Sequence, residues 1–255
     1  MSKGVQGAVL RLLRAETFRL RVKSTMLECG GLMKRITFSS PDELPAVLFE
    51  PAAWIRLWFR TSEGREVQRA YTVAGYAPDR STIDVSFYLH QTSGPAAAWA
   101  QRVRSGAMLD VSLLGSRPFH LDEWAKGVVL LGDETAFPAV RAILASLPDD
   151  IEARVLLTGE HDLSAFIPTR QRTDVHYLPV QRATHGFERM LRELDDSRIR
   201  DRAADNRVAA DELWHCWAAG ESSMMRAVRA AAKRSNVLCE QKPSTRSYWS
   251  RHRVI

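Results

Sequence analysis

Cysteine is scarce in this 255-residue chain, which has only Cys29, Cys216 and Cys239. The three are odd in number, lie far apart in the sequence and form no CxxC pair. A disulfide framework, a structural zinc site and an internal iron–sulfur cluster need more cysteines or closer spacing, so none of them is predicted. Free thiols are typical of reducing compartments, and we therefore expect a cytoplasmic protein.

Long apolar runs are also lacking. The N-terminal stretch AVLRLL (residues 8–13) is short and is interrupted by arginine, so it predicts neither a signal peptide nor a membrane span. Neither GxGxxG nor a Walker sequence is present, and a phosphate-binding loop of those two types is not predicted. The His and acidic residues show no metal-ligand spacing, so we expect no metal site. No heptad pattern indicates a partner helix, and we expect a monomer.

Positive charge is concentrated near the C-terminus. From Arg226 onward the chain has eight Lys/Arg residues and a single acid, Glu240, so this segment carries a charge of +7 and the rest of the chain −1, which gives the net charge of +6. Such asymmetry favours an anionic partner, although a solvated basic surface explains it equally well. No nucleic-acid-binding module accompanies the basic residues, and a nucleic-acid partner is not predicted.

The first half of the chain has the pattern of short antiparallel strands. Phe18, Leu20 and Val22 alternate with polar residues, and the segments 53–59 and 83–89 continue the pattern between turn residues. Only one helix is expected here, over residues 94–103. Many short strands with one helix predict a small antiparallel β-barrel, which we assign to residues 1–124.

The pattern changes near Lys126. The run GVVLL (127–131) is typical of a fully buried parallel strand, and further strands are expected at 152–158, 175–178 and 213–219. Helices are expected at 135–146 and 222–233, while the charged stretch 184–212 predicts a helix followed by a surface loop. Strands that alternate with helices predict a doubly wound α/β domain over residues 125–255.

A cation, an aromatic ring and a hydroxyl lie close together in RAYTV (69–73). In an extended segment Arg69 and Tyr71 share one face, while Thr72 points the other way. A guanidinium can bind a phosphate bidentately, and a tyrosine ring offers a flat surface to a flat cofactor. Further along, Gly94 and Pro95 indicate the start of a helix, whose first amides form an anion site. Together the two features can bind one flavin dinucleotide.

Several motifs resemble one known family in their order along the chain. They are RAYTV (69–73), DVSFYLH (84–90), GPAAAWA (94–100), GDETAFPAV (132–140), WAAGE (217–221) and YW (248–249). The pattern resembles the siderophore-interacting proteins, which are FAD-dependent ferric-siderophore reductases related to the ferredoxin reductases. Ser247 stands where that family has glycine, and His252 where glycine is common.

The resemblance implies the following roles. Arg69 would neutralise the pyrophosphate of FAD, Tyr71 would pack on the isoalloxazine ring, and Thr72 with Val73 would bind its edge. His90 and the segment Gly94, Pro95 and Ala96 would hold the phosphate or ribose, with Asp133, Thr135, Ala136 and Trp249 as further flavin neighbours. The small residues Ala219 and Gly220, with Glu221, would face the nicotinamide of NADH or NADPH. The candidates for binding an anionic ferric siderophore are Arg56, Arg117 and Arg246.

The implied reaction transfers electrons from NADH or NADPH through FAD to siderophore-bound ferric iron. The cofactor supplies the redox chemistry, so no catalytic side chain is assigned. A general NAD(P)H:flavin or ferredoxin-type reductase is the neighbouring alternative. A flavin- or siderophore-binding module without turnover is the alternative from a different class.

Overall fold

A computed structural model describes residues 15–89, 94–123, 125–205, 213–238 and 243–250. His90, Cys239 and His252 lie outside the described residues. The chain forms two compact units, residues 1–119 and residues 120–255, each of which is described by itself.

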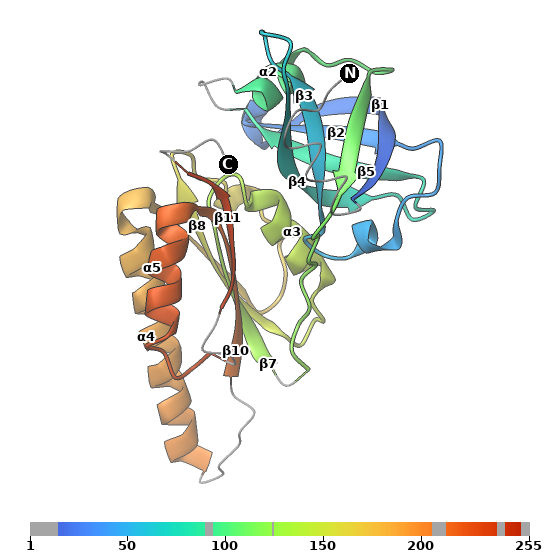
Figure 1. The fold of residues 1–255 in the computed structure, drawn as a ribbon. Coiled ribbons are helices and arrows are strands. Elements are labelled where there is room, and N and C mark those ends of the chain that lie inside the picture. The colour runs from blue at the N-terminus through green and yellow to red at the C-terminus, as the bar shows by residue number, and fades with distance from the viewer. Residues whose placement is uncertain (1–14, 90–93, 124, 206–212, 239–242, 251–255) are drawn as a thin grey trace. The chain divides into compact units, whose positions relative to one another are not determined.

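Unit 1 (residues 1–119) is a closed barrel of six antiparallel strands in the order β1-β2-β5-β4-β3-β6, and β6 pairs with β1 to close it (Figure 1). The predicted antiparallel barrel is thereby confirmed. Its elements are β1 (Glu16–Glu28), η1 (Cys29–Gly31), β2 (Met33–Ser39), η2 (Ala46–Phe49), β3 (Trp54–Arg60), β4 (Glu66–Tyr76), β5 (Thr82–Tyr88), α2 (Pro95–Arg102) and β6 (Met108–Leu113).

Alternation along the strands fills the barrel. In β3 every second residue is fully buried, namely Ile55, Leu57 and Phe59, and β5 contributes Val85 and Phe87 in the same way. Because successive side chains of a strand point to opposite faces, these residues form one core while the intervening ones face outward. The period-two pattern in the sequence therefore determines which face of each strand is inside.

Unit 2 (residues 120–255) is a five-stranded parallel sheet in the order β11-β10-β7-β8-β9. Helices α4 and α5 cover one face of the sheet, and α3 lies on the other (Figure 1), so the predicted α/β architecture is confirmed. Its elements are β7 (Ala125–Gly132), α3 (Phe137–Ser146), β8 (Glu152–Gly159), η3 (Ser164–Phe166), β9 (Thr173–Pro179), α4 (Val180–Asp205), β10 (Leu213–Glu221), α5 (Ser222–Ala232) and β11 (Ser244–Trp249).

The order of the strands defines where a ligand can bind. The chain runs from β7 outward through β8 to β9 and then places β10 on the other side of β7, where Ala219 pairs with Gly132. Open parallel sheets bind ligands at the carboxyl ends of their strands, at the point where the strand order reverses. In unit 2 this point lies between the carboxyl ends of β7 and β10. We call the carboxyl ends of β7, β8 and β10 together the carboxyl edge.

The fifth strand, β11, was not predicted. Residues 244–249 (STRSYW) are mostly polar, and the sequence suggested only a tail. In the structure they pair in parallel with β10, so that Arg246 lies opposite Ala219. An edge strand has only one hydrogen-bonded neighbour, and it therefore needs no apolar pattern of its own.

Other properties of the described residues are as follows. None of their helices has the length and hydropathy needed to cross a membrane. Within the same residues, no group of three or more His, Cys, Asp or Glu could hold a metal ion. Cys216 is a buried free thiol whose pKa is raised by burial to about 12, so it stays protonated and unreactive at neutral pH.

Candidate functional site

Arg69 and Tyr71 lie on the inward face of β4. Their partners across the strand pair are Leu57 and Ile55, which are both fully buried in the barrel. Thr72 pairs with Trp54 and lies on the opposite face of the strand. The strand thus separates the side chains of RAYTV into an inner pair and an outer hydroxyl.

Tyr71 connects the strand to helix α2 through an aromatic cluster. Its ring centroid lies 4.3 Å from that of Phe87 and 6.1 Å from that of Phe59, and Trp99 of α2 lies 5.5 Å from Phe59 and 5.8 Å from Phe87. Burial raises the pKa of the Tyr71 phenol, with the Arg69 charge acting in the opposite direction. The cluster links the two sequence features that were assigned to the flavin.

Arg69 is a half-buried cation next to this cluster. Its Nη1 donates a 2.7 Å hydrogen bond to the carbonyl oxygen of Gln68, and burial lowers the pKa of its guanidinium. A guanidinium has five N–H donors, so further donors of Arg69 can bind an anion such as a phosphate. A partly desolvated cation binds an anion more strongly than a solvated one does.

The first turn of α2 also suits an anion. Gly94 is the N-cap residue, no side chain caps the helix, and Pro95 occupies the first turn. A Cβ atom placed on Gly94 would meet nothing within 4 Å, so the helix start is open. The first amides of a helix are orphan donors, and they attract negative charge. Arg69 and the start of α2 each offer donors of the kind that binds a phosphate.

One of the three arginines predicted to bind the substrate packs on a tryptophan, and the segment that carries a second one contacts the backbone of the same residue. The Arg56 guanidinium carbon lies 4.8 Å from the centroid of the Trp54 ring, and its buried Nε has no hydrogen-bond partner. Burial lowers the pKa of Arg56. The hydroxyl of Ser116 accepts a 3.0 Å hydrogen bond from the Trp54 amide, which places the segment that carries Arg117 beside Trp54. Arg246, on β11, belongs to unit 2.

In unit 2 the Asp133 carboxylate joins three elements at the carboxyl edge. Its Oδ1 accepts hydrogen bonds from the Thr135 amide (2.9 Å), the Thr135 hydroxyl (2.5 Å) and the Ala136 amide (3.3 Å). Its Oδ2 accepts from the Glu221 amide (2.9 Å) and from the Trp249 indole N–H (2.7 Å). Asp133 is only 4% exposed, and this burial raises its pKa, while the hydrogen bonds from Thr135 and Trp249 act to lower it.

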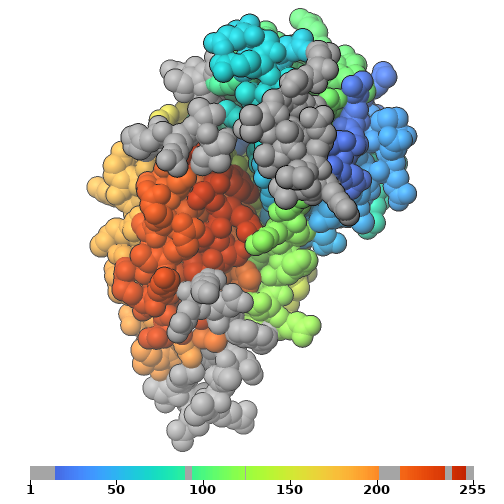
Figure 2. Space-filling model, in the orientation of Figure 1, coloured from blue at the N-terminus to red at the C-terminus, as the bar shows by residue number. Residues whose placement is uncertain are grey.

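These contacts bring together residues that the sequence assigned separately. Asp133, Thr135, Ala136 and Trp249 had been assigned to the flavin, and Glu221 to the nicotinamide, yet all five meet at one carboxylate. Besides the Trp249 indole bond to Asp133, a second side-chain hydrogen bond holds β11: the Ser222 hydroxyl donates to the Trp249 carbonyl oxygen at 2.8 Å. Figure 2 shows the surface that α5 and β11 form, coloured orange to red. The Trp249 side of this strand is accessible, with the residue 36% exposed.

Glu221 is the N-cap residue of α5, and its carboxylate accepts hydrogen bonds from backbone amides as that of Asp133 does. Its Oε2 accepts hydrogen bonds from the amides of Ser223 (2.6 Å) and Met224 (3.1 Å). Glu221 is 8% exposed. A carboxylate at this position accepts hydrogen bonds from amides that have no partner within the helix. Its negative charge also interacts favourably with the positive end of the helix dipole.

Glu134 is a residue of this edge that the sequence did not identify. Its Oε1 accepts hydrogen bonds from the amides of Glu160 (2.5 Å) and His161 (3.0 Å), which follow β8. Glu134 is 8% exposed. The sequence features that could have identified Glu134 are the two acids of GDET and the glycine that ends β8. No pattern in the sequence indicates that Glu134 lies against Gly159.

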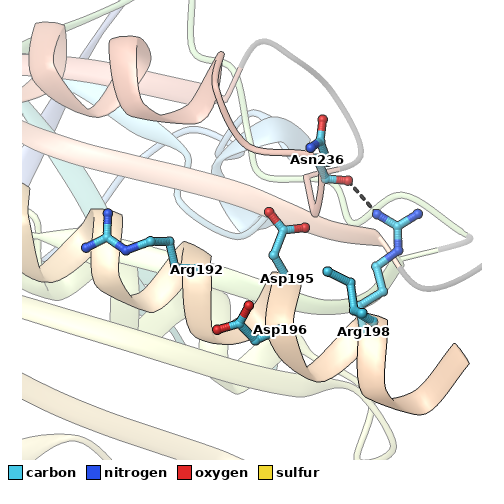
Figure 3. Close-up of a pocket in the computed structure, with 6 residues that line it drawn as sticks. Arg192, Asp195, Asp196, Arg198 and Asn236 are labelled. Atoms are coloured by element: carbon cyan, nitrogen blue, oxygen red, sulfur yellow. Dashed lines mark hydrogen bonds between the residues drawn. The ribbon is translucent and has the colours of Figure 1, made fainter. Parts of the chain in front are cut away.

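One cavity of unit 2 lies elsewhere. It measures about 450 Å³, and its lining comes from the second half of α4 and from the residue Asn236 (Figure 3). Arg198 donates a 2.6 Å hydrogen bond to the Asn236 carbonyl oxygen at its rim. The cavity has charges of both signs from Arg192, Asp195, Asp196 and Arg198, and it contains none of the predicted site residues.

Two family models match the chain. The model described as a siderophore-interacting FAD-binding domain matches residues 20–115, and the model described as siderophore-interacting protein matches residues 125–252.

Curated relatives are similar to different lengths of the chain. Over its whole length the chain is 29% identical to the mycobactin import ATP-binding/permease protein IrtA of Mycolicibacterium thermoresistibile, of which it covers 27%. It is also 29% identical over 117 residues to the ferric acinetobactin reductase of Acinetobacter baumannii, an alignment that covers 45% of this chain and 40% of that protein. The chain thus spans only part of these curated relatives.

Solved structures agree in fold. The siderophore-interacting protein of Acinetobacter baumannii matches with a TM-score of 0.71 at 23% identity, over 94% of this chain and 92% of that chain. A ferredoxin NADP+ reductase of Neisseria gonorrhoeae, solved with bound FAD and NADP, matches with a TM-score of 0.59 at 16% identity, over 92% of this chain and 100% of that chain. The arrangement of a barrel followed by a parallel sheet is therefore ferredoxin-reductase-like.

Proposed function

Since the chain belongs to the siderophore-interacting protein family, we propose that it is a flavin-dependent reductase of ferric siderophores. We further propose that NADH or NADPH supplies the electrons and that the chain acts in the cytoplasm. The observation that carries the proposal is that the barrel unit contains both the half-buried Arg69 and a helix start, that of α2, which no side chain caps.

Arg69 and the amides of Gly94 and Ala96 would bind the FAD phosphates, with Pro95 setting the helix start, and Tyr71, Thr72 and Val73 would orient the ring. Bound FAD supplies the chemistry that converts a two-electron donor into single-electron transfers to iron. The chain binds and orients, and no side chain needs to exchange a proton with the substrate. Ferrous iron binds anionic oxygen ligands more weakly than ferric iron does, so reduction favours release of the metal.

Arg56, Arg117 and Arg246 are proposed to bind the substrate, an anionic ferric siderophore. The half-buried guanidinium of Arg56 supports this assignment, because a partly desolvated cation binds an anion more strongly than a solvated one does. The neighbouring Trp54 ring offers a flat apolar surface to an aromatic group such as a catecholate.

The reaction is tested by spectroscopy on the purified chain. Under anaerobic conditions we expect flavin bands that bleach on photoreduction and return when a ferric siderophore is added, with ferrous iron trapped by a chelator. Bleaching by NADH or NADPH tests the donor separately. Flavin that is reduced but not reoxidised by ferric siderophores, while free flavin or a carrier protein reoxidises it, would favour the general reductase. A chain that takes up no FAD would contradict the proposal.

Replacing Arg56, Arg117 and Arg246 together with alanine should raise the KM for an anionic ferric siderophore about 10- to 100-fold. Three partly exposed charge contacts are together worth about 1.5–3 kcal/mol, and 1.4 kcal/mol corresponds to a factor of ten. FAD affinity should not change. The measurement is the rate of ferrous iron release at varied substrate concentration.

A matched control keeps the change in net charge constant. Arg19, Arg65 and Arg189 each form an exposed ion pair, with Asp110, Glu63 and Glu193, and their triple alanine variant also removes three positive charges. If both triple variants raise the KM equally, the effect comes from net charge, and none of the three assigned arginines is specific to substrate binding.

A further inference from the structure

The carboxyl edge of the unit 2 sheet has three groups of backbone amides, and each is already occupied by a carboxylate of the chain. Asp133 takes the amides at the start of α3, Glu221 takes those at the start of α5, and Glu134 takes those of residues 160 and 161. Dinucleotide-binding sheets use amides at such positions to bind pyrophosphate. In this chain the amides are satisfied internally.

The two glycines of the edge fit the carboxylates closely. Gly159 has φ +152°, and a Cβ there would lie 2.1 Å from the Glu134 carboxylate. Gly220 has φ +144°, and a Cβ there would lie 2.5 Å from Oδ2 of Asp133. Glycines in dinucleotide-binding folds let the backbone approach the ligand. These two glycines instead let the backbone approach the side chains of the same chain.

A dinucleotide would have to displace these groups. All three carboxylates are at least nine-tenths buried and tethered to the same edge, so they compete with a dissolved phosphate at a high effective concentration. The edge is also acidic at its β8 end, where the exposed Glu160 and Asp162 follow Gly159. Like charges close together disfavour a second anion.

We propose that Asp133, Glu134 and Glu221 replace the pyrophosphate cradle of unit 2, so that NADH and NADPH bind only weakly and by their non-phosphate parts. This inference rests on the proposed function for the identity of the donor. Flavin reduction is then proportional to nucleotide concentration without saturating, and NADH and NADPH behave alike. Glu134 is the residue chosen for the test, because its two amides belong to a loop and its loss therefore leaves both helix starts capped.

The test is calorimetric titration of the FAD-loaded chain with ADP-ribose, which carries the adenosine and the pyrophosphate but cannot reduce the flavin. We expect a Kd weaker than about 0.5 mM, which corresponds to roughly −4.5 kcal/mol. Glu134→Ala frees the amides of residues 160 and 161 and should tighten this Kd at least about tenfold, the effect of one or two charge-assisted hydrogen bonds.

The control is Glu160→Ala, which removes one negative charge from the same loop and leaves the amides bound to Glu134. Its Kd should change less than about threefold, as expected for an exposed charge. A wild-type Kd tighter than 0.5 mM would overturn the proposal, as would equal tightening in the two variants. If Glu134→Ala does not fold, the wild-type Kd still tests the proposal, because a value tighter than about 0.5 mM overturns it.

The two proposals fail in different experiments. If photoreduced flavin is not reoxidised by ferric siderophores, the proposed function is wrong. The affinity for ADP-ribose still shows whether unit 2 can bind a pyrophosphate. If ADP-ribose binds tightly while siderophore reduction proceeds, the proposed function stands and the inference about Asp133, Glu134 and Glu221 is wrong.

Discussion

Asp133→Ala should cost unit 2 about 2–5 kcal/mol of unfolding free energy and should release β11 from the sheet. The carboxylate accepts hydrogen bonds from the Thr135 amide, the Glu221 amide and the Trp249 indole, and alanine takes the acceptor away from both amides. Each buried donor without a partner costs about 1–3 kcal/mol. Urea unfolding followed by tryptophan fluorescence measures the free energy, and hydrogen exchange of residues 244–249 measures the release of the strand.

Two variants isolate the cause. Trp249→Phe removes only the indole donor and should cost about 1 kcal/mol. Asp174→Ala removes an acid of similar size from an exposed ion pair with Arg154 in the same sheet, and it should cost less than about 1 kcal/mol. A loss for Asp133→Ala no larger than that for Asp174→Ala, or unchanged exchange in β11, would show that Asp133 does not hold the three elements together.

Arg69→Ala should weaken FAD binding about 10- to 100-fold. Hydrogen bonds to charged groups are worth about 1.5–3 kcal/mol, and the half-buried Arg69 is the only cation of β4 and acts electrostatically on Tyr71. Quenching of flavin fluorescence on titration into the apo-protein measures the Kd. Arg69→Lys keeps the charge without the two-pronged geometry and should give an intermediate value.

The control for this change is Arg65→Ala. Arg65 lies in the exposed connection between β3 and β4 and forms an ion pair with Glu63, so its loss removes the same charge from the same hairpin. Its FAD affinity should match the wild type. Equal weakening in both variants, or none in Arg69→Ala, would remove Arg69 from the proposed flavin site.

Local patterns accounted for most of the fold. The alternation of Phe18, Leu20 and Val22 predicted β1, and the buried run at 127–131 predicted β7, because burial on one face or on both leaves a periodic trace in the sequence. The polar edge strand β11 left no such trace. Its pairing with β10 depends on hydrogen bonds of the backbone, which every sequence can form.

The candidate site was less predictable than the fold. The RAYTV motif places Arg69 and Tyr71 on one face by strand geometry alone, and the structure has them there. The position of Tyr71 against Phe87 and near Trp99 follows from the pairing of β4 with β5 and from the packing of α2. The sequence could indicate a helix start at Gly94 but not the ring cluster that connects it to β4.

By itself, the sequence determined the two architectures, the motifs and the side chains available for binding. The tertiary structure decided what those side chains contact. Asp133 and Trp249 are 116 positions apart, and Glu134 binds amides 26 and 27 positions away. Such contacts arise because the strand order places the carboxyl ends of β7, β8, β10 and β11 next to one another, and no local pattern encodes that order.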